Sequence, residues 1–211
     1  MNIQLQILPL LSVLFLFLVA PVVIILAVSF WDYTEFSLIP DFVLTNYIEI
    51  FESGVTYSTY LNTFKFAFLG WSFTVIIGFT LAYFLAFHVR TLRWQIILFL
   101  ICTIPFWTSN IIRMIAWIPV LGRNGLMNSL LLELGVIGEP LEWLLYSDFA
   151  VILAFVHLYT LFMLVPIFNS MMRIDKSIIE AAQDMGANSL QILINVIIPL
   201  CLPGIAIGTI F

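Results

Sequence analysis

The strongest constraint on this chain is a series of long apolar runs with almost no charge. Residues 7–30 contain no charged side chain at all. At about 1.5 Å of rise per helical residue, such a run is long enough to cross a hydrocarbon core of about 30 Å. Because 63% of the residues are hydrophobic and only 9% are charged, a water-soluble fold is excluded and lipid must be the main solvent.

Four further apolar runs predict further membrane spans, at residues 64–87, 95–112, 149–172 and 192–211. The first run is not preceded by the basic residues of a secretory signal, so we interpret it as a retained first span. The predicted fold class is an all-α, polytopic transmembrane helical bundle with five visible spans, forming a single domain over residues 1–211. Because the fifth run continues to the last residue, we expect the intact protein to extend further at its C-terminus.

The distribution of lysine and arginine predicts the orientation in the membrane. The loops at 88–94 and 173–191 carry four basic residues, Arg90, Arg93, Arg173 and Lys176. The alternate loops carry two, Arg113 and Arg123. We therefore expect the first pair of loops and the N-terminus to be cytoplasmic. Nine of the twelve acidic residues fall in the outer loops, where they either solvate the loops or attract cations.

The second outer loop, residues 113–148, has its own predicted structure. Gly122-Arg123-Asn124-Gly125 is typical of a tight turn, because glycine and asparagine tolerate positive φ. The apolar pieces beside this turn predict short helices at the membrane surface, with Trp117 and Trp143 near the headgroups.

The segment at 173–191 contrasts with the rest of the chain, because small and charged residues interrupt the apolar runs. Ser177 and Glu180 have the spacing of a capping box at the start of a short helix. Gly186 is suited to the left-handed position just after that helix, and Asn188 or Ser189 could cap a second helix. The segment is either a simple turn between spans or a docking element for another protein.

The composition of the short helix favours close approach by a partner. Ile178, Ala182 and Met185 recur at the spacing of one helical face. Ala181 and Ala182 carry almost no side-chain bulk, so a second protein surface could come near the backbone.

The same segment resembles the EAA loop of permease subunits in ABC-type importers. In that family the motif is EAA, three residues, glycine, nine residues and then Ile-x-Leu-Pro. Here it reads Glu180-Ala181-Ala182, Gly186 and Val196-Ile197-Ile198-Pro199, with conservative changes near its end. The stretches Pro105-Phe106-Trp107 and Leu121-Gly122-Arg123-Asn124-Gly125 are similar to the spermidine/putrescine branch, so the resemblance covers most of the chain.

The resemblance implies a type I ABC importer permease with six spans, of which the sixth is absent here. It implies a second homologous permease, two copies of a cytoplasmic ATPase and a periplasmic binding protein as partners, in the bacterial inner membrane. No nucleic acid partner is expected. The loop at 173–191 would be the cytoplasmic coupling element, docking on the ATPase through eight residues: Ser177, Ile178, Glu180, Ala181, Ala182, Asp184, Met185 and Gly186.

No catalytic site is predicted in this chain. A phosphate-binding GxxxxGK[ST] loop is absent from the sequence, so ATP and magnesium would be used by the partner ATPase, and this chain would bind no cofactor or metal. Cys102 and Cys201 lie in apolar runs and are expected to pack as small apolar residues.

Several residues are candidates for the substrate pathway: Trp107, Asn110, His157, Tyr159, Glu133 and Asp148. Aromatic faces and carboxylates suit a flexible polycation such as spermidine or putrescine. The alternatives for these residues are packing and interface anchoring, and a hydrogen bond to a neighbouring helix for His157. Pro199 and Pro203 are expected to kink the fifth span, either as a pivot or as ordinary packing of a bent helix.

The sequence therefore predicts a permease subunit that forms half of a polyamine import pathway. The alternatives are a permease for another small solute, such as an amino acid or organic anion, and a membrane scaffold or enzyme without a transport role.

Overall fold

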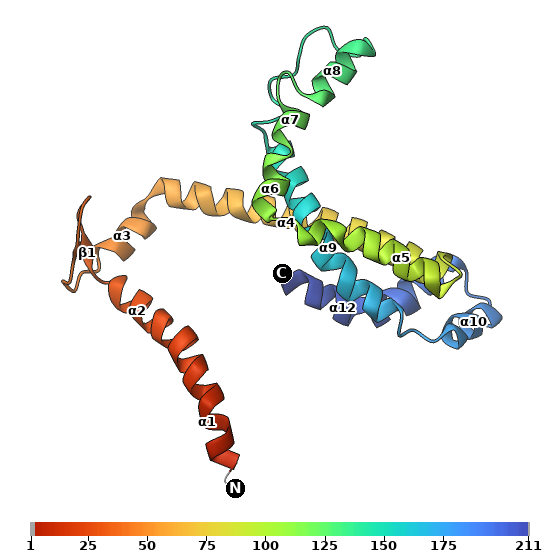
Figure 1. Cartoon of the computed structure of the whole chain (residues 1–211), viewed down its shortest axis with the longest axis horizontal. Coiled ribbons are helices and arrows are strands. Elements are labelled where there is room, and N and C mark those ends of the chain that lie inside the picture. The colour runs from red at the N-terminus through yellow and green to blue at the C-terminus, as the bar shows by residue number, and fades with distance from the viewer. Residues whose placement is uncertain (1–2, 211) are drawn as a thin grey trace. The chain divides into compact units, whose positions relative to one another are not determined.

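The computed structural model describes residues 3–210 of the chain (Figure 1). It separates into two compact units, one up to residue 62 and one from residue 63 onward. Among the described residues, four helices are long and apolar enough to cross a membrane, or five if one bent pair counts as a span. This confirms the predicted all-α, polytopic class, to which the structure adds only a pair of two-residue strands.

The first unit begins with a nearly continuous helix formed by α1 (Ile3–Leu14), the π-helical η1 (Phe15–Val19) and α2 (Ala20–Val28). It contains the span Ile7–Val28, as predicted. Pro21 lies two residues after the end of η1, and its missing backbone N–H accounts for the local loosening to a π-helical turn.

A small hairpin and a short helix follow in this unit. The antiparallel strands β1 (Asp32–Tyr33) and β2 (Leu38–Ile39) pair Asp32 with Ile39, and α3 covers Thr45–Glu52. The amide of Asn46 donates to the backbone oxygens of Ser29 and Trp31, which holds the end of α2 against the start of α3.

The second long helix begins earlier than its apolar run predicts. Helix α4 covers Gly54–Tyr83 and continues into η2 (Phe84–His88), so the span starts at Gly54 rather than at residue 64. Polar residues in the first turns remain exposed and keep their helical hydrogen bonds, so a charge-free run marks the lipid-crossing part of this helix and not its beginning.

The predicted third span, residues 95–112, is not one straight helix. Helix α5 (Leu92–Thr103) and η3 (Ile104–Trp107) are followed, after a 93° bend, by α6 (Asn110–Ile115). Thr108 and Ser109 have extended ψ angles of 148° and 138° at the bend. Pro105 removes one helical donor just before it. The absence of charge in this run did not reveal the break in the backbone.

The outer loop contains the predicted short helices, here α6, α7 (Ile118–Leu121) and α8 (Leu126–Glu133). The tight turn is present, with the Gly125 amide donating to Gly122 O at 2.8 Å. The reason predicted for its glycines is wrong, because φ is −60° at Gly122 and −83° at Gly125. Both glycines are required by close approach: an added Cβ would lie 2.8 Å from a backbone oxygen in each case.

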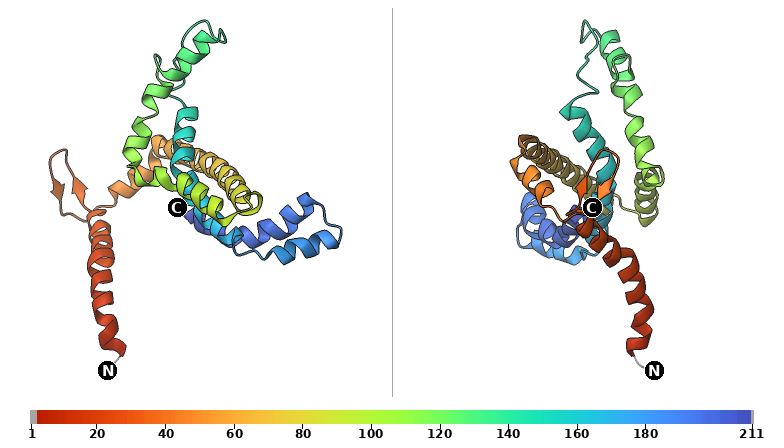
Figure 2. Two further views of the ribbon diagram at one scale, coloured as in Figure 1. Left: turned by 45° about the vertical axis from the view of Figure 1, so that its right-hand side comes forward. Right: turned by 90° about the vertical axis from the view of Figure 1, so that its left-hand side faces the viewer.

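The core of the second unit is formed where α9 (Asp148–Met171) packs along α12 (Ile198–Ile210), as Figures 1 and 2 show. Helix α9 confirms the predicted fourth span, and the fifth span is the segment Ser189–Ile210. The fully buried side chains at this contact include Leu164, Ile167 and Cys201. Cys102 and Cys201 are free thiols, in agreement with their predicted packing role.

The fifth span is built from α11 (Ser189–Ile192), the π-helical η4 (Leu193–Ile197) and α12. Pro199 is the second residue of α12, two residues after the end of η4, and Pro203 lies further inside α12. The π-helical turn before Pro199 is a departure from regular α-helix at the predicted position. The role of these prolines as a hinge stays a prediction.

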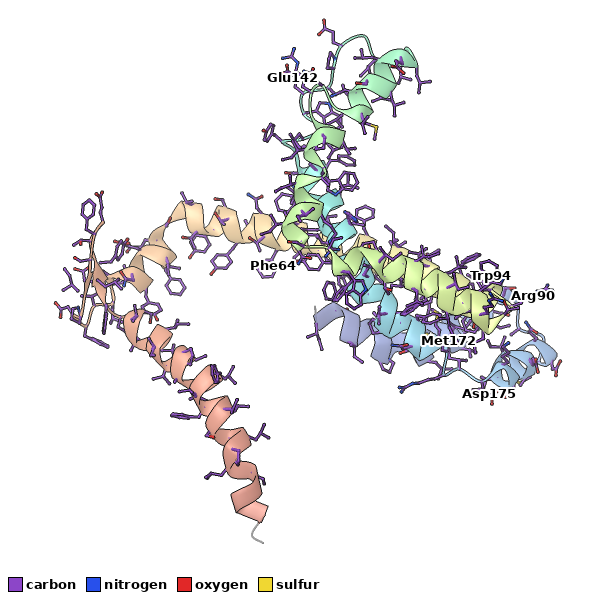
Figure 3. The ribbon with its side chains drawn as sticks, in the orientation of Figure 1. Phe64, Arg90, Trp94, Glu142, Met172 and Asp175 are labelled. Atoms are coloured by element: carbon purple, nitrogen blue, oxygen red, sulfur yellow. The ribbon has the colours of Figure 1, made fainter. Side chains whose placement is uncertain are left out.

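Figure 3 shows that the two predicted cytoplasmic loops lie at the same end of the second unit. Arg90, two residues before α5, and Trp94, in its first turn, are at the same end as Met172 and Asp175, whereas Glu142 is at the far end. This arrangement agrees with the prediction that the loops at 88–94 and 173–191 lie on one side of the membrane and the loop at 113–148 lies on the other.

Candidate functional site

The short helix of the EAA-like loop is α10 (Lys176–Asp184), and Asp175 is its N-cap. The Asp175 carboxylate accepts a hydrogen bond from the Ser177 amide at 3.0 Å. The predicted capping box between Ser177 and Glu180 is therefore wrong. Asp and Ser are about equally good caps, and Asp175 starts the helix two residues earlier, which places Ser177 inside the first turn.

The C-terminal end of α10 agrees with the prediction for Gly186. Gly186 has φ of +86°, in the left-handed region. The Ala187 amide donates to Ala182 O at 3.0 Å and the Gly186 amide donates to Gln183 O at 2.8 Å. These two bonds form a Schellman motif, which satisfies the last carbonyls of the helix and reverses the chain.

The next helix begins immediately after this turn. Asn188 and Gln191 form a reciprocal capping box, with bonds of 2.8 and 2.9 Å between each side chain and the other residue's backbone amide. Asn188 is thus the cap among the two candidates. Because both helix ends are closed by local bonds, α10 is held in a defined orientation despite its short length.

The structure does not place Ile178, Ala182 and Met185 on one face of α10, as the sequence had predicted. Ala182 is buried, at 6% exposure, and packs in the core with Ile179 partly buried beside it. Ile178 and Met185 are exposed, at 45% and 83%. The outward face therefore consists of Ile178, Ala181 and Met185, and Ala182 belongs to the opposite face.

Glu180 lines a cavity of about 360 Å³ between α10 and the end of α4. Tyr83, Phe87 and His88 form the far wall, and Lys176 is also on the lining. Gln95 supports this wall, since its buried amide donates to Ala86 O and Val89 O at 3.1 and 3.0 Å. The Glu180 carboxylate thus faces a polar recess that stays open to solvent.

The charge at the start of α10 is stable at neutral pH. The backbone and side chain of Ser177 donate hydrogen bonds to Asp175, which lowers the pKa of this carboxyl below its ordinary value. Asp175 therefore stays ionised and complements the positive N-terminal end of the helix.

The predicted pathway residues do not converge on one site. Trp107 is 87% exposed and lines a cavity of about 740 Å³ between η3, α9 and α12. Asn169 and Ser170 of α9 line the same cavity, as does Arg173, two residues after the end of this helix. Asn169, which is exposed, was missed by the sequence analysis, although the sequence shows it as an amide inside the apolar run 149–172, where polar side chains are rare.

Tyr159 lines a second cavity, of about 340 Å³, between α4, α9 and α12. Three further aromatic side chains lie on its wall, those of Phe66, Trp71 and Phe155. The indole N–H of Trp71 donates to the Thr209 hydroxyl at 3.0 Å, which ties α4 to α12.

His157 and Asn110 make local contacts instead of lining either cavity. The Trp117 indole N–H donates to His157 Nδ1 at 3.1 Å, and the rings meet edge to face. The predicted hydrogen bond of His157 is thus present, although its donor lies in the turn between α6 and α7 and not within a helix. Asn110 accepts from the guanidinium of Arg113, which is buried and keeps Nε and Nη1 without a hydrogen-bond partner.

The two candidate acids have different surroundings. Asp148, at the start of α9, forms an ion pair with Lys65 of α4. Glu133 is exposed at the end of α8. The partnership of Lys65 with Asp148 was not predicted, because 83 residues separate the two positions in the chain.

A scan against protein-family models finds no match. The chain is 34% identical over 197 residues to the spermidine/putrescine transport system permease protein PotB of Escherichia coli, covering 93% of this chain and 70% of that protein. It is 31% identical over 199 residues to the PotB protein of Haemophilus influenzae, covering 93% and 68%.

A solved structure has the same fold. A chain of a bacterial alginate ABC transporter, crystallised with an alginate pentasaccharide-bound periplasmic protein, superposes with a TM-score of 0.77. It is 20% identical, and the superposition covers 96% of this chain and 68% of that one. At this identity the likeness concerns the fold alone.

Proposed function

This chain belongs to the spermidine/putrescine permease family of ABC transporters, and we propose that it forms one half of a polyamine import pathway across the bacterial inner membrane. It is a transport permease and not an enzyme, with ATP hydrolysed by a separate ATPase subunit. The observation that carries the proposal is the EAA-like loop, kept at full spacing in a chain similar to PotB over 93% of its length.

The coupling role is assigned to α10. Its outward face, Ile178, Ala181 and Met185, combines two exposed apolar side chains with one small residue, which suits insertion into a groove on an ATPase subunit. Side-chain and backbone hydrogen bonds close both ends of α10. A displacement of α10 by the ATPase would therefore move α11, which is the start of the fifth span. Each such ATPase would bind ATP and magnesium, and this chain would bind neither.

Further partners are needed because this chain would form only one half of the import pathway. A second homologous permease would complete the translocation path, a second ATPase copy would serve that permease, and a periplasmic binding protein would deliver the substrate. The larger cavity beside α9, with Trp107 and Asn169 on its wall, is the candidate surface for the path on this subunit. We place the N-terminus in the cytoplasm on the distribution of basic residues.

Substitution of two loop residues tests the coupling role. In the assembled transporter, Glu180→Lys replaces the carboxylate on the recess with a second ammonium group beside Lys176, and Gly186→Pro removes the amide that bonds Gln183 O. We expect either change to reduce co-purification of the ATPase, or to leave ATP hydrolysis running without uptake. The measurements are subunit stoichiometry, ATPase rate and uptake of labelled spermidine in proteoliposomes.

The control for this experiment is Asp175→Ala, which frays α10 without touching Glu180 or the turn. A loss in Glu180→Lys that exceeds the loss in Asp175→Ala points to a docking contact. Normal uptake in both Glu180→Lys and Gly186→Pro would rule the coupling role out. Competition by spermidine and putrescine, compared with amino acids and organic anions, separates the polyamine assignment from a permease for another small solute.

A further inference from the structure

An ammonium group is already held between the first half of α4 and the start of α9, by a carboxylate and an aromatic ring. The Lys65 ammonium pairs with Asp148 and lies 5.3 Å from the centroid of the Phe66 ring. A carboxylate beside an aromatic face is the combination that recognises an alkylammonium cation. The Lys65 side chain is 48% exposed and that of Asp148 59%, so a cation from solution can reach the same place.

The aromatic ring beside this ammonium is also part of the wall of the second cavity. Phe66 lines the cavity of about 340 Å³, together with Trp71, Phe155 and Tyr159. On α9, Asp148, Phe155 and Tyr159 recur at positions i, i+7 and i+11, so they share one face. The distance along the helix from Asp148 to Tyr159 is about 16 Å at 1.5 Å per residue. One carboxylate is thus followed by a row of aromatic rings.

We propose that Asp148, Phe66 and the aromatic cavity of Tyr159 form a binding site for one end of a polyamine, and that the Lys65 ammonium is an internal stand-in which the substrate ammonium displaces. This inference rests on the proposed function, since it names where the imported polyamine first meets this subunit. Lysine and a polyamine end in the same primary ammonium group, so the exchange keeps the charge of the site constant. The methylene chain of the substrate would lie on Phe155 and Tyr159.

The alternative explanation, that the Lys65–Asp148 ion pair only stabilises the fold, predicts different effects of substitution. An ion pair between half-exposed side chains contributes little to stability, and Asp148 is already favoured in the first turn of α9 by the helix dipole. If the pair served stability alone, removing either partner would have the same effect. If Lys65 is a stand-in, removing Lys65 frees the site and removing Asp148 destroys it.

The test measures spermidine binding to the complete transporter in nanodiscs, without the binding protein, for Lys65→Gln and Asp148→Asn. We expect Lys65→Gln to lower the Kd about threefold, because the competent fraction of the site rises. We expect Asp148→Asn to raise the Kd about fivefold or more, because the charged acceptor is lost. The double variant should resemble Asp148→Asn. Glu139→Gln removes an exposed acid elsewhere in the outer loop and is the matched control.

Two substitutions of Phe66 test the aromatic part of the site separately. Phe66→Leu should weaken binding and Phe66→Tyr should retain it, because only the second keeps a ring at the ammonium. Equal shifts of the Kd in the same direction for Lys65→Gln and Asp148→Asn would overturn the inference, as would unchanged binding in Asp148→Asn. Uptake of spermidine by the wild-type transporter with its binding protein is measured in parallel, so that failure of the proposed function is seen separately.

Discussion

At the residue scale, Asp175 changes how substitutions in the coupling loop are interpreted. The sequence assigned the helix cap to Ser177 and Glu180, which would have made Glu180 a structural residue as well as a docking residue. Asp175 closes the helix through its bond from the Ser177 amide, and Glu180 lines the recess beside Tyr83 and His88. A change at Glu180 therefore leaves the N-terminal cap intact. Its effect on uptake can be attributed to the recess and to the ATPase proposed to dock there.

The pH dependence of this cap is a prediction for the Asp175→Asn variant. The pKa of Asp175 is lowered in the folded state, so its stabilising contribution is complete above the ordinary carboxyl value of 3.8 and is lost as the pH falls through the lowered pKa. Hydrogen-exchange protection of α10, corrected for intrinsic rates, should be constant between about pH 5 and pH 7 and should fall only in stronger acid. In Asp175→Asn the amide oxygen still accepts, so protection should remain but lose this acid dependence. A change of protection between pH 5 and pH 7 in the wild type that the variant abolishes would contradict the assignment.

At the scale of elements, the contact between α9 and α12 depends on two glycines. A Cβ added at Gly204 would lie 2.6 Å from Pro166 O, and one added at Gly208 would lie 3.1 Å from the Met163 Cα. These are contacts with backbone atoms, which cannot rotate away, and small residues allow such close approach between helices in membranes. We predict that Gly204→Ala destabilises the permease by about 1–3 kcal/mol through overpacking.

The measurement for Gly204→Ala is the thermal unfolding midpoint of the assembled permease in detergent. Gly138→Ala is the matched control, because a Cβ at Gly138 would meet no atom within 4 Å and its φ is not positive. The control should unfold like the wild type. Equal midpoints for Gly204→Ala and the wild type would show that the two helices separate enough to accept a methyl group.

The success of sequence-based prediction also differs from element to element. Residues 149–172 were predicted as a span and form α9, because lipid crossing depends on apolar length, which is visible in the sequence. The run 95–112 is equally free of charge and yet bends by 93° after Trp107. Backbone breaks depend on local φ and ψ at Thr108 and Ser109, and apolar length carries no information about them.

In the candidate site too, features set by neighbouring residues were predictable and features set by tertiary packing were not. The Gly186 turn and the Asn188 cap were predictable because their hydrogen bonds join neighbours in the chain. The grouping of Ile178, Ala182 and Met185 on one face was wrong, since burial of Ala182 depends on the core packed behind α10. The pair between Lys65 and Asp148 joins residues far apart in sequence, and helical periodicity alone cannot find it.

At the scale of the whole molecule, the orientation in the membrane is the remaining prediction. The loops that contain Arg90 and Lys176 are richer in basic residues than the loops that contain Glu35 and Glu142. Basic residues in short loops tend to stay in the cytoplasm, so we predict that the first span runs from the cytoplasm outward. Four single-cysteine variants at these positions, made in a background with Cys102 and Cys201 replaced by serine, report on each side of the membrane.

In spheroplasts, a membrane-impermeant maleimide should label Glu35→Cys and Glu142→Cys. Arg90→Cys and Lys176→Cys should react only after the membrane is permeabilised. The background contributes no thiol of its own, and uptake of labelled spermidine shows that each variant is assembled. The opposite labelling pattern would place α10 outside the cell, where no ATPase could dock on it. The orientation test therefore bears directly on the coupling role, because a coupling helix has to share a compartment with the enzyme that drives it.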